Sequence, residues 1–444
     1  YTPSAGLRVA SAVSPSGLQK GGIVWIAQSG SAFSALPNND RRLGFTLAVS
    51  TGMELVTTVA DYMDWALHQP ETRVIGLFVE TIRDPAGFLQ ALDAARQRAI
   101  PVVILKVGRT AKSAQMAVSH TGAIAGNDAV YEAVFRAYGV HRVADMDEMA
   151  ATLALFDTSR KPAPGQLGSI HDSGGERELI VDIAEDYGIE FAALEPATRS
   201  ALATHLEPGL VAENPLDAFG THNDLENRFA ALIAALVNDP NVGIGLFMSN
   251  PRDGYEYAES YSRAVMKAAQ MTDKPLALAS NYSMAGDSDL AIRLRQAGVP
   301  LLRGTRNALL AVRHVMNDRD YRDRLNRHAR ARATTPAAPS PDGQMVTRWR
   351  SRLCEKGPVT EADGLDMLAD FGLVTPGVAR VASLHELEAA LSDMQFPLVI
   401  KTAEDYAHKS DVGGVRLNIT DAVAASAAYQ DMALRLGPQA LVME

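Results

Sequence analysis

The sequence has a single cysteine in 444 residues and no long apolar run, and we expect no signal peptide. One cysteine, Cys354, excludes an intrachain disulfide and a zinc site built from several cysteines, which favours the reducing cytoplasm. A helix needs about 20 consecutive apolar residues to cross a bilayer, and no run approaches that length. We therefore expect a cytoplasmic protein with no membrane partner.

Basic residues are in the minority. Lys and Arg number 42 against 52 Asp and Glu, a formal net charge of −10, so there is no overall attraction to nucleic acid. The sequence contains no Walker P-loop, hydrolase triad or metal-ligand cluster, and Gly165, Gly168 and Gly174 lack the spacing of a dinucleotide-binding fingerprint. A local anion site made of backbone N–H groups remains open.

Strands and helices alternate along the first 160 residues. Strands are predicted at 22–28, 46–50, 73–79 and 101–105, and helices at 31–42, 56–67 and 85–98. Because these strands are uniformly apolar, they indicate a parallel sheet covered on both faces. A second unit repeats the pattern from Gln166 onward, since 241–248 resembles 72–79 and 274–279 resembles 100–105. The expected fold class is α/β, with two doubly wound parallel-sheet domains in tandem.

The composition changes after the second unit. Residues 318–332 are predicted to form a charged, arginine-rich helix, and 334–341 a Pro/Ala/Ser-rich linker. RNA binding is an alternative for this helix, but its interspersed acidic residues favour a solvated surface. The predicted organisation is a lead-in at 1–20, domains at 21–160 and 161–317, helix and linker at 318–345, and a third unit at 346–444. Both ends look cut, so we expect a longer polypeptide.

Two Ser–Gly loops stand where a strand turns into a helix. A helix N-terminus offers free N–H donors and a partial positive charge, glycine lets an anion approach, and serine adds a hydroxyl. Ordinary helix capping is the alternative interpretation of each loop. Their matching positions in the repeat suggest that both helix ends point at one shared anion. The candidate phosphate-binding residues are Ser29, Gly30, Ser31, Ser173, Gly174 and Gly175.

His120 lies in a segment of small residues, 119–126, just before a predicted helix. A neutral imidazole accepts a phosphoryl group near neutral pH, and two helix N-termini would stabilise the phosphohistidine. The alternative is a loop histidine that caps the following helix. Glu80, which follows the apolar strand at 73–79, is the candidate partner for the second ring nitrogen. The alternative for Glu80 is a surface residue after a strand.

Two candidates lie in the third unit. Lys401 closes an apolar strand before a Gly-Gly loop, where a lysine reaches an ATP phosphate; a solvated lysine is the alternative. His408 lies in a loop rich in Lys, Ser, Asp and Gly, which suits phosphate handling. Without further context, His408 would be interpreted as part of a plain polar turn.

The chain resembles the NDP-forming acyl-CoA synthetases, the family of succinyl-CoA synthetase and the ADP-forming acetate–CoA ligases. The resemblance spans nearly the whole chain, and its two most specific motifs are SHTGAIAG and HKSDVGGV. The matching stretches are AQSGSAF (27–33), VIGLFVETIRD (74–84), VVILKVGRT (102–110), SHTGAIAGND (119–128), HDSGGE (171–176), ENPLDAFG (213–220) and AHKSDVGGVRLN (407–418).

The resemblance implies two flavodoxin-like domains followed by part of an ATP-grasp domain. It implies that His120 is the phosphorylated histidine, that Glu80 supports it, and that the two Ser–Gly loops hold the phosphate. Lys401 would contact an ATP phosphate, and His408 would shuttle phosphate between distant sites. The implied partners are ATP, CoA and a small carboxylic acid, with Mg²⁺ ligands outside this chain and a homo-oligomer, a dimer or tetramer, as the assembly.

The sequence also departs from the family. Only a tail of the usual CoA-binding domain would fit at 1–20, and the ATP-grasp domain stops about halfway. The usual Gly-Asn-Glu run after Ser50 is replaced by residues 51–56, which hints at an unusual acid substrate. An ATP-dependent lyase of the dimethylsulfoniopropionate type, or a non-catalytic CoA- or nucleotide-sensing module, is the alternative to a ligase.

Overall fold

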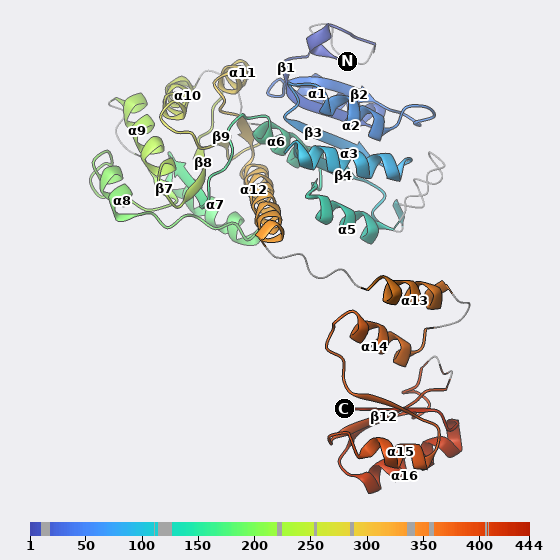
Figure 1. Cartoon of the computed structure of the whole chain (residues 1–444). Helices are drawn as coiled ribbons and strands as arrows, with labels where there is room; N and C mark the ends of the chain where they lie inside the picture. The colour runs from blue at the N-terminus through green and yellow to red at the C-terminus, as the bar shows by residue number, and fades with distance from the viewer. Residues whose placement is uncertain are drawn as a thin grey trace. The chain divides into compact units, whose positions relative to one another are not determined.

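The computed structural model divides into two compact units, Tyr1–Arg330 and Ala331–Glu444, each of which is described by itself (Figure 1). The described residues are 1–9, 18–110, 112, 113, 127–219, 224–252, 255–284, 288–334, 342–354, 359–404, 406 and 408–444. His120 and its motif lie outside them.

The first sheet of the larger unit has five parallel strands in the order β2-β1-β3-β4-β5. This is the strand order of a flavodoxin-like fold, in which ligands bind beyond the carboxyl ends of the strands where the order reverses. The reversal, or switch point, lies between β1 and β3. The strands are β1 (Lys20–Ala27), β2 (Phe45–Ser50), β3 (Val74–Val79), β4 (Val102–Lys106) and β5 (His141–Arg142).

The second sheet repeats this topology. Its order is β10-β9-β8-β6-β7, again all parallel, so its switch point lies between β6 and β8. The expectation of two doubly wound parallel sheets is confirmed. The strands are β6 (Gln166–His171), β7 (Leu216–Asp217), β8 (Val242–Met248), β9 (Leu276–Ser280) and β10 (Leu301–Arg303).

Helices cover both faces of each sheet, as the apolar strands require. In β1, Ile23 and Trp25 face one apolar cluster and Val24 and Ile26 the other. The helices are α1 (Gly30–Asn39), α2 (Val59–Leu67), α3 (Pro85–Gln97), α5 (Asp128–Tyr138), α6 (Met146–Phe156), α7 (Gly174–Asp186), α8 (Pro196–Ala203), α9 (Leu225–Val237), α10 (Glu256–Ala269), α11 (Ser288–Gln296) and α12 (Thr305–Thr334), with a 3-10 turn at Pro3–Ala5.

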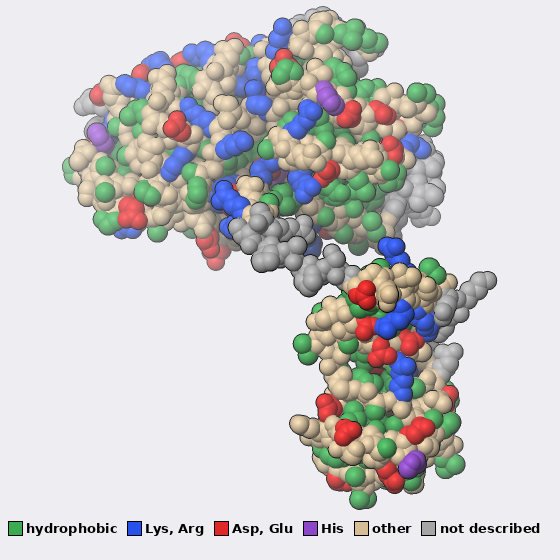
Figure 2. Space-filling view, viewed as in Figure 1, with side chains coloured by type: hydrophobic (Ala, Val, Ile, Leu, Met, Phe, Trp, Pro, Cys, Tyr) green, Lys and Arg blue, Asp and Glu red, His purple; other side chains and the backbone are tan. Residues whose placement is uncertain are grey.

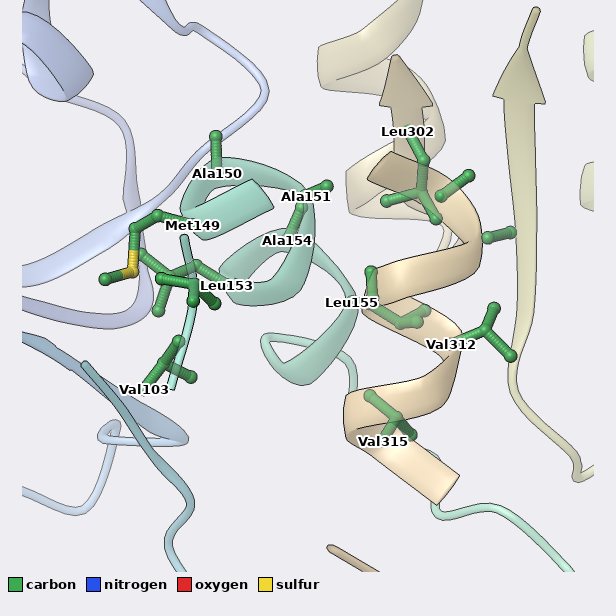
Figure 3. Close-up of a cluster of buried hydrophobic side chains, with 14 of the residues drawn as sticks. Val103, Met149, Ala150, Ala151, Leu153, Ala154, Leu155, Leu302, Val312 and Val315 are labelled. Atoms are coloured by element: carbon green, nitrogen blue, oxygen red, sulfur yellow. The ribbon is translucent and has the colours of Figure 1, made fainter. Parts of the chain in front are cut away.

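One apolar cluster joins the two sheets. Side chains of α6 and α12 meet in it, and Figure 3 shows Leu155 of α6 close to Val312 and Val315 of α12. Within the same interface, His314 Nε2 lies 3.0 Å from Glu148 Oε1, and both side chains are buried. This shared core makes Tyr1–Arg330 one compact unit.

Two predicted helix starts differ from the structure. The helix expected from residue 56 begins at Val59 because Thr58 caps it: Thr58 accepts a hydrogen bond from the Asp61 backbone N–H, and the Asp61 carboxylate accepts one from the Thr58 backbone N–H. The charged segment expected from residue 318 is the second half of α12, which begins at Thr305. The first half of α12 is apolar and packs in the shared core.

The smaller unit has a four-stranded antiparallel sheet in the order β11-β14-β12-β13. The C-terminal strand lies inside this sheet, between β11 and β12. The elements are α13 (Gly343–Cys354), α14 (Glu361–Asp370), β11 (Val378–Val381), α15 (Leu384–Leu391), β12 (Leu398–Thr402), β13 (Val415–Ile419), α16 (Ala422–Leu436) and β14 (Ala440–Met443).

The surface carries charges of both signs. Acidic and basic side chains are interspersed on the face of each unit that Figure 2 shows. Of the helices in the described part of the chain, none combines the length and the apolar character that crossing a bilayer requires.

Candidate active site

The switch point of the first sheet brings together the end of β1 and the end of β3. Ala27 pairs with Phe78 in register, so Gln28 and Glu80 follow directly at the carboxyl edge. Phe78 packs on the cluster that contains α1, and side chains two residues apart share a face, so Glu80 lies on the α1 side of the sheet. Glu80 is half-buried.

The first Ser–Gly loop forms the start of α1. Ser29 is the N-cap residue, and its Oγ accepts a hydrogen bond from the Ala32 backbone N–H at 3.3 Å. No acidic residue stands in the first turn. A β-carbon at Gly30 would have its nearest neighbour, Ser50 Oγ, 3.9 Å away. The helix start therefore combines a partial positive charge with open space, as an anion site requires.

Gln28 connects Glu80 to the loop after β2. Its Oε1 accepts the backbone N–H groups of Glu80 at 2.6 Å and of Thr81 at 3.2 Å. Its Nε2 donates to the Thr81 carbonyl at 2.8 Å and to Glu54 Oε1 at 2.7 Å. The sequence identified neither Gln28 nor Glu54 as a site residue. Two features of the sequence could have identified these residues. Gln28 directly precedes Ser29, and Glu54 lies in the stretch that departs from the family pattern.

Lys106 ends β4, next to β3, because Val79 pairs with it in register. Its side chain is 5% exposed; Nζ donates to the Val107 carbonyl at 2.5 Å and lies 4.6 Å from the centre of the Tyr131 ring. Burial lowers the pKa of the Lys106 ammonium, and the charge of Asp128 opposes this effect most strongly. Lys106 is thus a buried cation at the same edge as Glu80, and it too was missed.

The segment with His120 runs between two described anchors, the end of β4 at Lys106 and the start of α5 at Asp128. At the second anchor, Arg142 forms an ion pair with Asp128 at 2.7 Å, which holds the pKa of that carboxyl below its usual value. The role assigned to His120 itself stays a prediction.

The second Ser–Gly loop has a different environment. Ser173 precedes α7 but makes no side-chain cap hydrogen bond. Asp172 directly precedes it, Glu176 lies in the first turn, and a β-carbon at Gly174 would lie 2.9 Å from Asp217 Oδ2. Burial, reinforced by the charge of Glu176, raises the pKa of Asp172 to about 7.

Asn250, just beyond β8, donates to Glu176 Oε1 at 2.6 Å. Among the described residues, no hydrogen bond joins the Ser173, Gly174 and Gly175 loop to the Ser29, Gly30 and Ser31 loop. The shared anion between these loops stays a prediction.

In the smaller unit, Lys401 lies at the end of β12 and forms an ion pair with Glu361 of α14, with 2.7 Å between Nζ and Oε1. Lys409 approaches the other oxygen of Glu361 at 3.6 Å. Both lysines lower the pKa of Glu361, Lys401 more strongly. His408 is exposed and stands directly before Lys409. Two lysines therefore converge on one carboxylate, that of Glu361.

Two family models match the chain in the order that the sequence suggested. A succinyl-CoA ligase like flavodoxin domain matches residues 20–156, and an ATP-grasp domain matches residues 354–441. In both matched regions the chain is similar to the NDP-forming acyl-CoA synthetases. An ADP-forming acetate–CoA ligase of Archaeoglobus fulgidus is 28% identical over 413 residues, which cover 90% of this chain and 56% of that protein. The family resemblance that the motifs indicated is confirmed.

Other relatives of this family carry different acyl groups in their names. A trans-feruloyl-CoA synthase is 27% identical over 91% of this chain and 55% of its own length. A 4-hydroxybutyrate–CoA ligase of Nitrosopumilus maritimus is 25% identical over 91% of this chain and 57% of its own. The chain therefore spans a little over half the length of these curated relatives.

A solved structure supports the fold. The dinucleotide-forming acetyl-coenzyme A synthetase 1 of Candidatus Korarchaeum cryptofilum, in complex with phosphate and ADP, aligns with a TM-score of 0.60 and 20% identity, covering 71% of this chain and 68% of that one.

Proposed function

We propose that this chain carries the phosphoryl-transfer part of an ATP-dependent, ADP-forming acyl-CoA ligase. The observation that carries the proposal is the switch point of the first sheet. Glu80 follows β3 at the sheet edge where α1 begins without an acidic residue in its first turn, and β3 pairs with β4, the strand before the His120 segment. The chemistry is that of an acid–thiol ligase.

The reaction divides into three transfers. The γ-phosphoryl group of ATP passes to a ring nitrogen of His120, and ADP leaves. The phosphoryl group then passes from His120 to a carboxylate oxygen of the acid, which gives an acyl phosphate. The CoA thiolate attacks the acyl carbon and displaces inorganic phosphate. Covalent catalysis of this kind replaces one difficult condensation by transfers between activated species.

The residues of the chain have separate tasks in this scheme. The N–H groups at the start of α1 would hold the phosphoryl oxygens, and Glu80 would orient the imidazole and stabilise its charged form. In the smaller unit, Lys401 and Lys409 would release the Glu361 carboxylate and bind an ATP phosphate in its place. The exposed His408 would then transfer the phosphate onward. Among the described residues, no group of three His, Cys, Asp or Glu side chains could hold a metal ion, so no step is assigned to Mg²⁺ within them.

Labelling with ATP that carries a radioactive γ-phosphate tests the proposal on the full-length polypeptide. We expect label that is stable to alkali and lost in acid, and none in His120→Ala. His205→Ala, which removes an exposed histidine of α8's C-terminal turn, is the matched control and should label like wild type. Equal labelling of His120→Ala and wild type would refute the phosphoenzyme. Incubation with ATP, CoA and acetate, 4-hydroxybutyrate or trans-ferulate would then identify the acid by its CoA thioester.

A further inference from the structure

The loop after β2 has an inverted pattern of burial. Glu54 is 7% exposed, whereas its neighbours Met53, Leu55 and Val56 are 58%, 86% and 91% exposed. A charged side chain that is buried while apolar neighbours face water cannot be explained by the hydrophobic effect. The contacts of Glu54 must therefore organise this loop.

The backbone of Glu54 supports the same view. Its φ angle is +54°, in the left-handed region, which costs a residue with a β-carbon roughly 1–2 kcal/mol. Strained positions of this kind persist only where surrounding contacts hold them. Here Glu54 Oε1 accepts Gln28 Nε2 at 2.7 Å and Thr51 Oγ1 at 2.9 Å, while the buried Oε2 has no hydrogen-bond partner among the described residues.

The carboxylate of Glu54 and the Thr81 carbonyl together hold the NH₂ group of the Gln28 carboxamide. A carboxylate only accepts hydrogen bonds, so the NH₂ group of Gln28 must face Glu54. The Gln28 oxygen must then face the opposite way, where it accepts the backbone N–H groups of Glu80 and Thr81. The Thr81 carbonyl, which accepts the second Nε2 hydrogen at 2.8 Å, favours the same orientation, so loss of Glu54 removes one of the two acceptors that hold the Gln28 NH₂ group in place.

We propose that Glu54 is a positioning residue, which steadies the backbone at Glu80 by anchoring the Gln28 carboxamide together with the Thr81 carbonyl. The inference rests on the proposed function, because it gives Glu54 a role through Glu80. It connects Glu54, within the departing stretch 51–56, to the candidate active site. The chain of contacts is Glu54 to Gln28 to the backbone of Glu80 and Thr81.

The first test does not depend on activity. We would measure backbone amide hydrogen exchange at Glu80 and Thr81 in the full-length polypeptide. Glu54→Ala should speed exchange at both amides about fivefold, the effect of losing one ordered hydrogen bond. Glu54→Gln, whose amide oxygen can still accept from Gln28, should retain the wild-type rate. Unchanged exchange in Glu54→Ala would overturn the proposal even if the enzyme proved inactive on every acid.

The second test uses the phosphoenzyme. Glu54→Ala should slow its formation roughly tenfold, Glu54→Gln should restore it to within about twofold of wild type, and Thr51→Val should fall between them. In the Glu80→Ala background, Glu54→Ala should have no further effect, because residues that act as a unit are not additive. A full tenfold loss in that background would mean that Glu54 acts independently of Glu80.

A reciprocal exchange controls for damage to the fold. Gln28→Glu alone places two carboxylates face to face and should reduce both amide protection and labelling. Combining Gln28→Glu with Glu54→Gln restores one hydrogen-bond donor and one acceptor between the two positions. We expect this double variant to recover part of the amide protection and of the labelling. No recovery in a double variant that melts like wild type would contradict the orientation argument. Absence of label in wild type, by contrast, would refute the proposed function and leave the exchange test to decide on Glu54.

Discussion

The two switch points of the larger unit have the same topology but differ in how their carboxylates lie relative to the helix start. Register places His171 where the first sheet has Gln28, and Ser249 where it has Glu80. At the first point, the Gln28 carboxamide hydrogen-bonds to the Glu54 carboxylate and to the backbone of Glu80, and the first turn of α1 has no acidic residue. At the second, Asp172, Glu176 and Asp217 crowd around the start of α7.

The difference shows that a Ser–Gly helix start is not by itself a phosphate site. Both helices offer the same N–H donors and the same partial charge. Three carboxylates at α7 would repel a phosphate unless they are protonated or paired. His171, buried beside Ser169 with 2.8 Å between its Nε2 and Oγ, has its pKa lowered to about 3 by burial and is neutral, so it does not compensate. The proposed function therefore assigns the phosphoryl group to the first switch point.

Substitutions at the two register-equivalent positions, Glu80 and Ser249, should give the largest difference in activity. Glu80→Gln should slow phosphoenzyme formation about 100-fold or more, because it removes the charge that supports the imidazole while keeping the shape. Ser249→Ala removes a fully buried hydroxyl at the matching position and should change the rate less than twofold. Initial rates of acid-labile labelling measure both. Comparable losses would mean that the two switch points contribute equally.

The acidic character of the second switch point should appear in stability. The pKa of Asp172 is raised from 3.8 to about 7, so the folded state binds its proton more tightly than the unfolded state does. The protonated carboxyl of Asp172 therefore makes its full contribution to the free energy of unfolding below pH 4. That contribution is lost as the pH rises through about 7. A pKa change of this size corresponds to a contribution of at most about 4 kcal/mol to the free energy of unfolding. Because Asp172 is partly accessible to solvent, we expect a contribution of about 2 kcal/mol.

Asp172→Asn removes the titrating group. Its free energy of unfolding, from urea titrations, should match wild type at pH 4 and exceed it at pH 8. A variant that is less stable than wild type at pH 8 would show that the Asp172 carboxylate is stabilising, and the contrast between the two helix starts would be weaker than we argue.

A carboxylate introduced at α1 should make the first switch point resemble the second. Gly30→Asp has room for its side chain and suits a helix N-terminus, so stability should hold, while phosphoenzyme formation should fall about tenfold by repulsion of the phosphoryl group. Gly30→Asn is the neutral control. Gly175→Asp, also in open space, should change the rate less than twofold. Equal losses from both aspartates would restore the idea of one anion shared by two helix ends.

The fold was predictable from the sequence because its signals are local. The uniformly apolar strand Val74–Val79 and its counterpart Val242–Met248 indicated buried parallel strands, and the structure has them. Helix starts were less accurate, since the capping box of Thr58 and Asp61 overrides the apolar periodicity that begins at Val56.

The site was predictable only where its residues stand in a motif. Ser29 and Glu80 stand directly at strand ends, so topology brings them to one edge. Glu54 could not be found in this way, because burying it exposes Leu55 and Val56 and reverses the usual preference. Nor could Asp217 be foreseen next to Gly174, since that approach depends on how β6 and β7 pair. The interpretations of His120 and His408 rest on sequence motifs and stay predictions.

The smallest expected effect concerns Lys106, whose place in the second sheet is taken by Ala279. Lys106→Met keeps the volume and removes a buried charge, which offsets the loss of the hydrogen bond to Val107, so the free energy of unfolding should change by less than about 1 kcal/mol. Phosphoenzyme formation should slow about threefold, because Lys106 acts on the site through its charge without an ion pair to Glu80. Lys112→Met, at an exposed position on the same connection, is the control. Lys106→Met could instead abolish labelling without changing the unfolding curve. That result would mean that the Lys106 ammonium binds the phosphoryl group directly. The contrast between Lys106 and Ala279 would then be the main chemical difference between the two switch points.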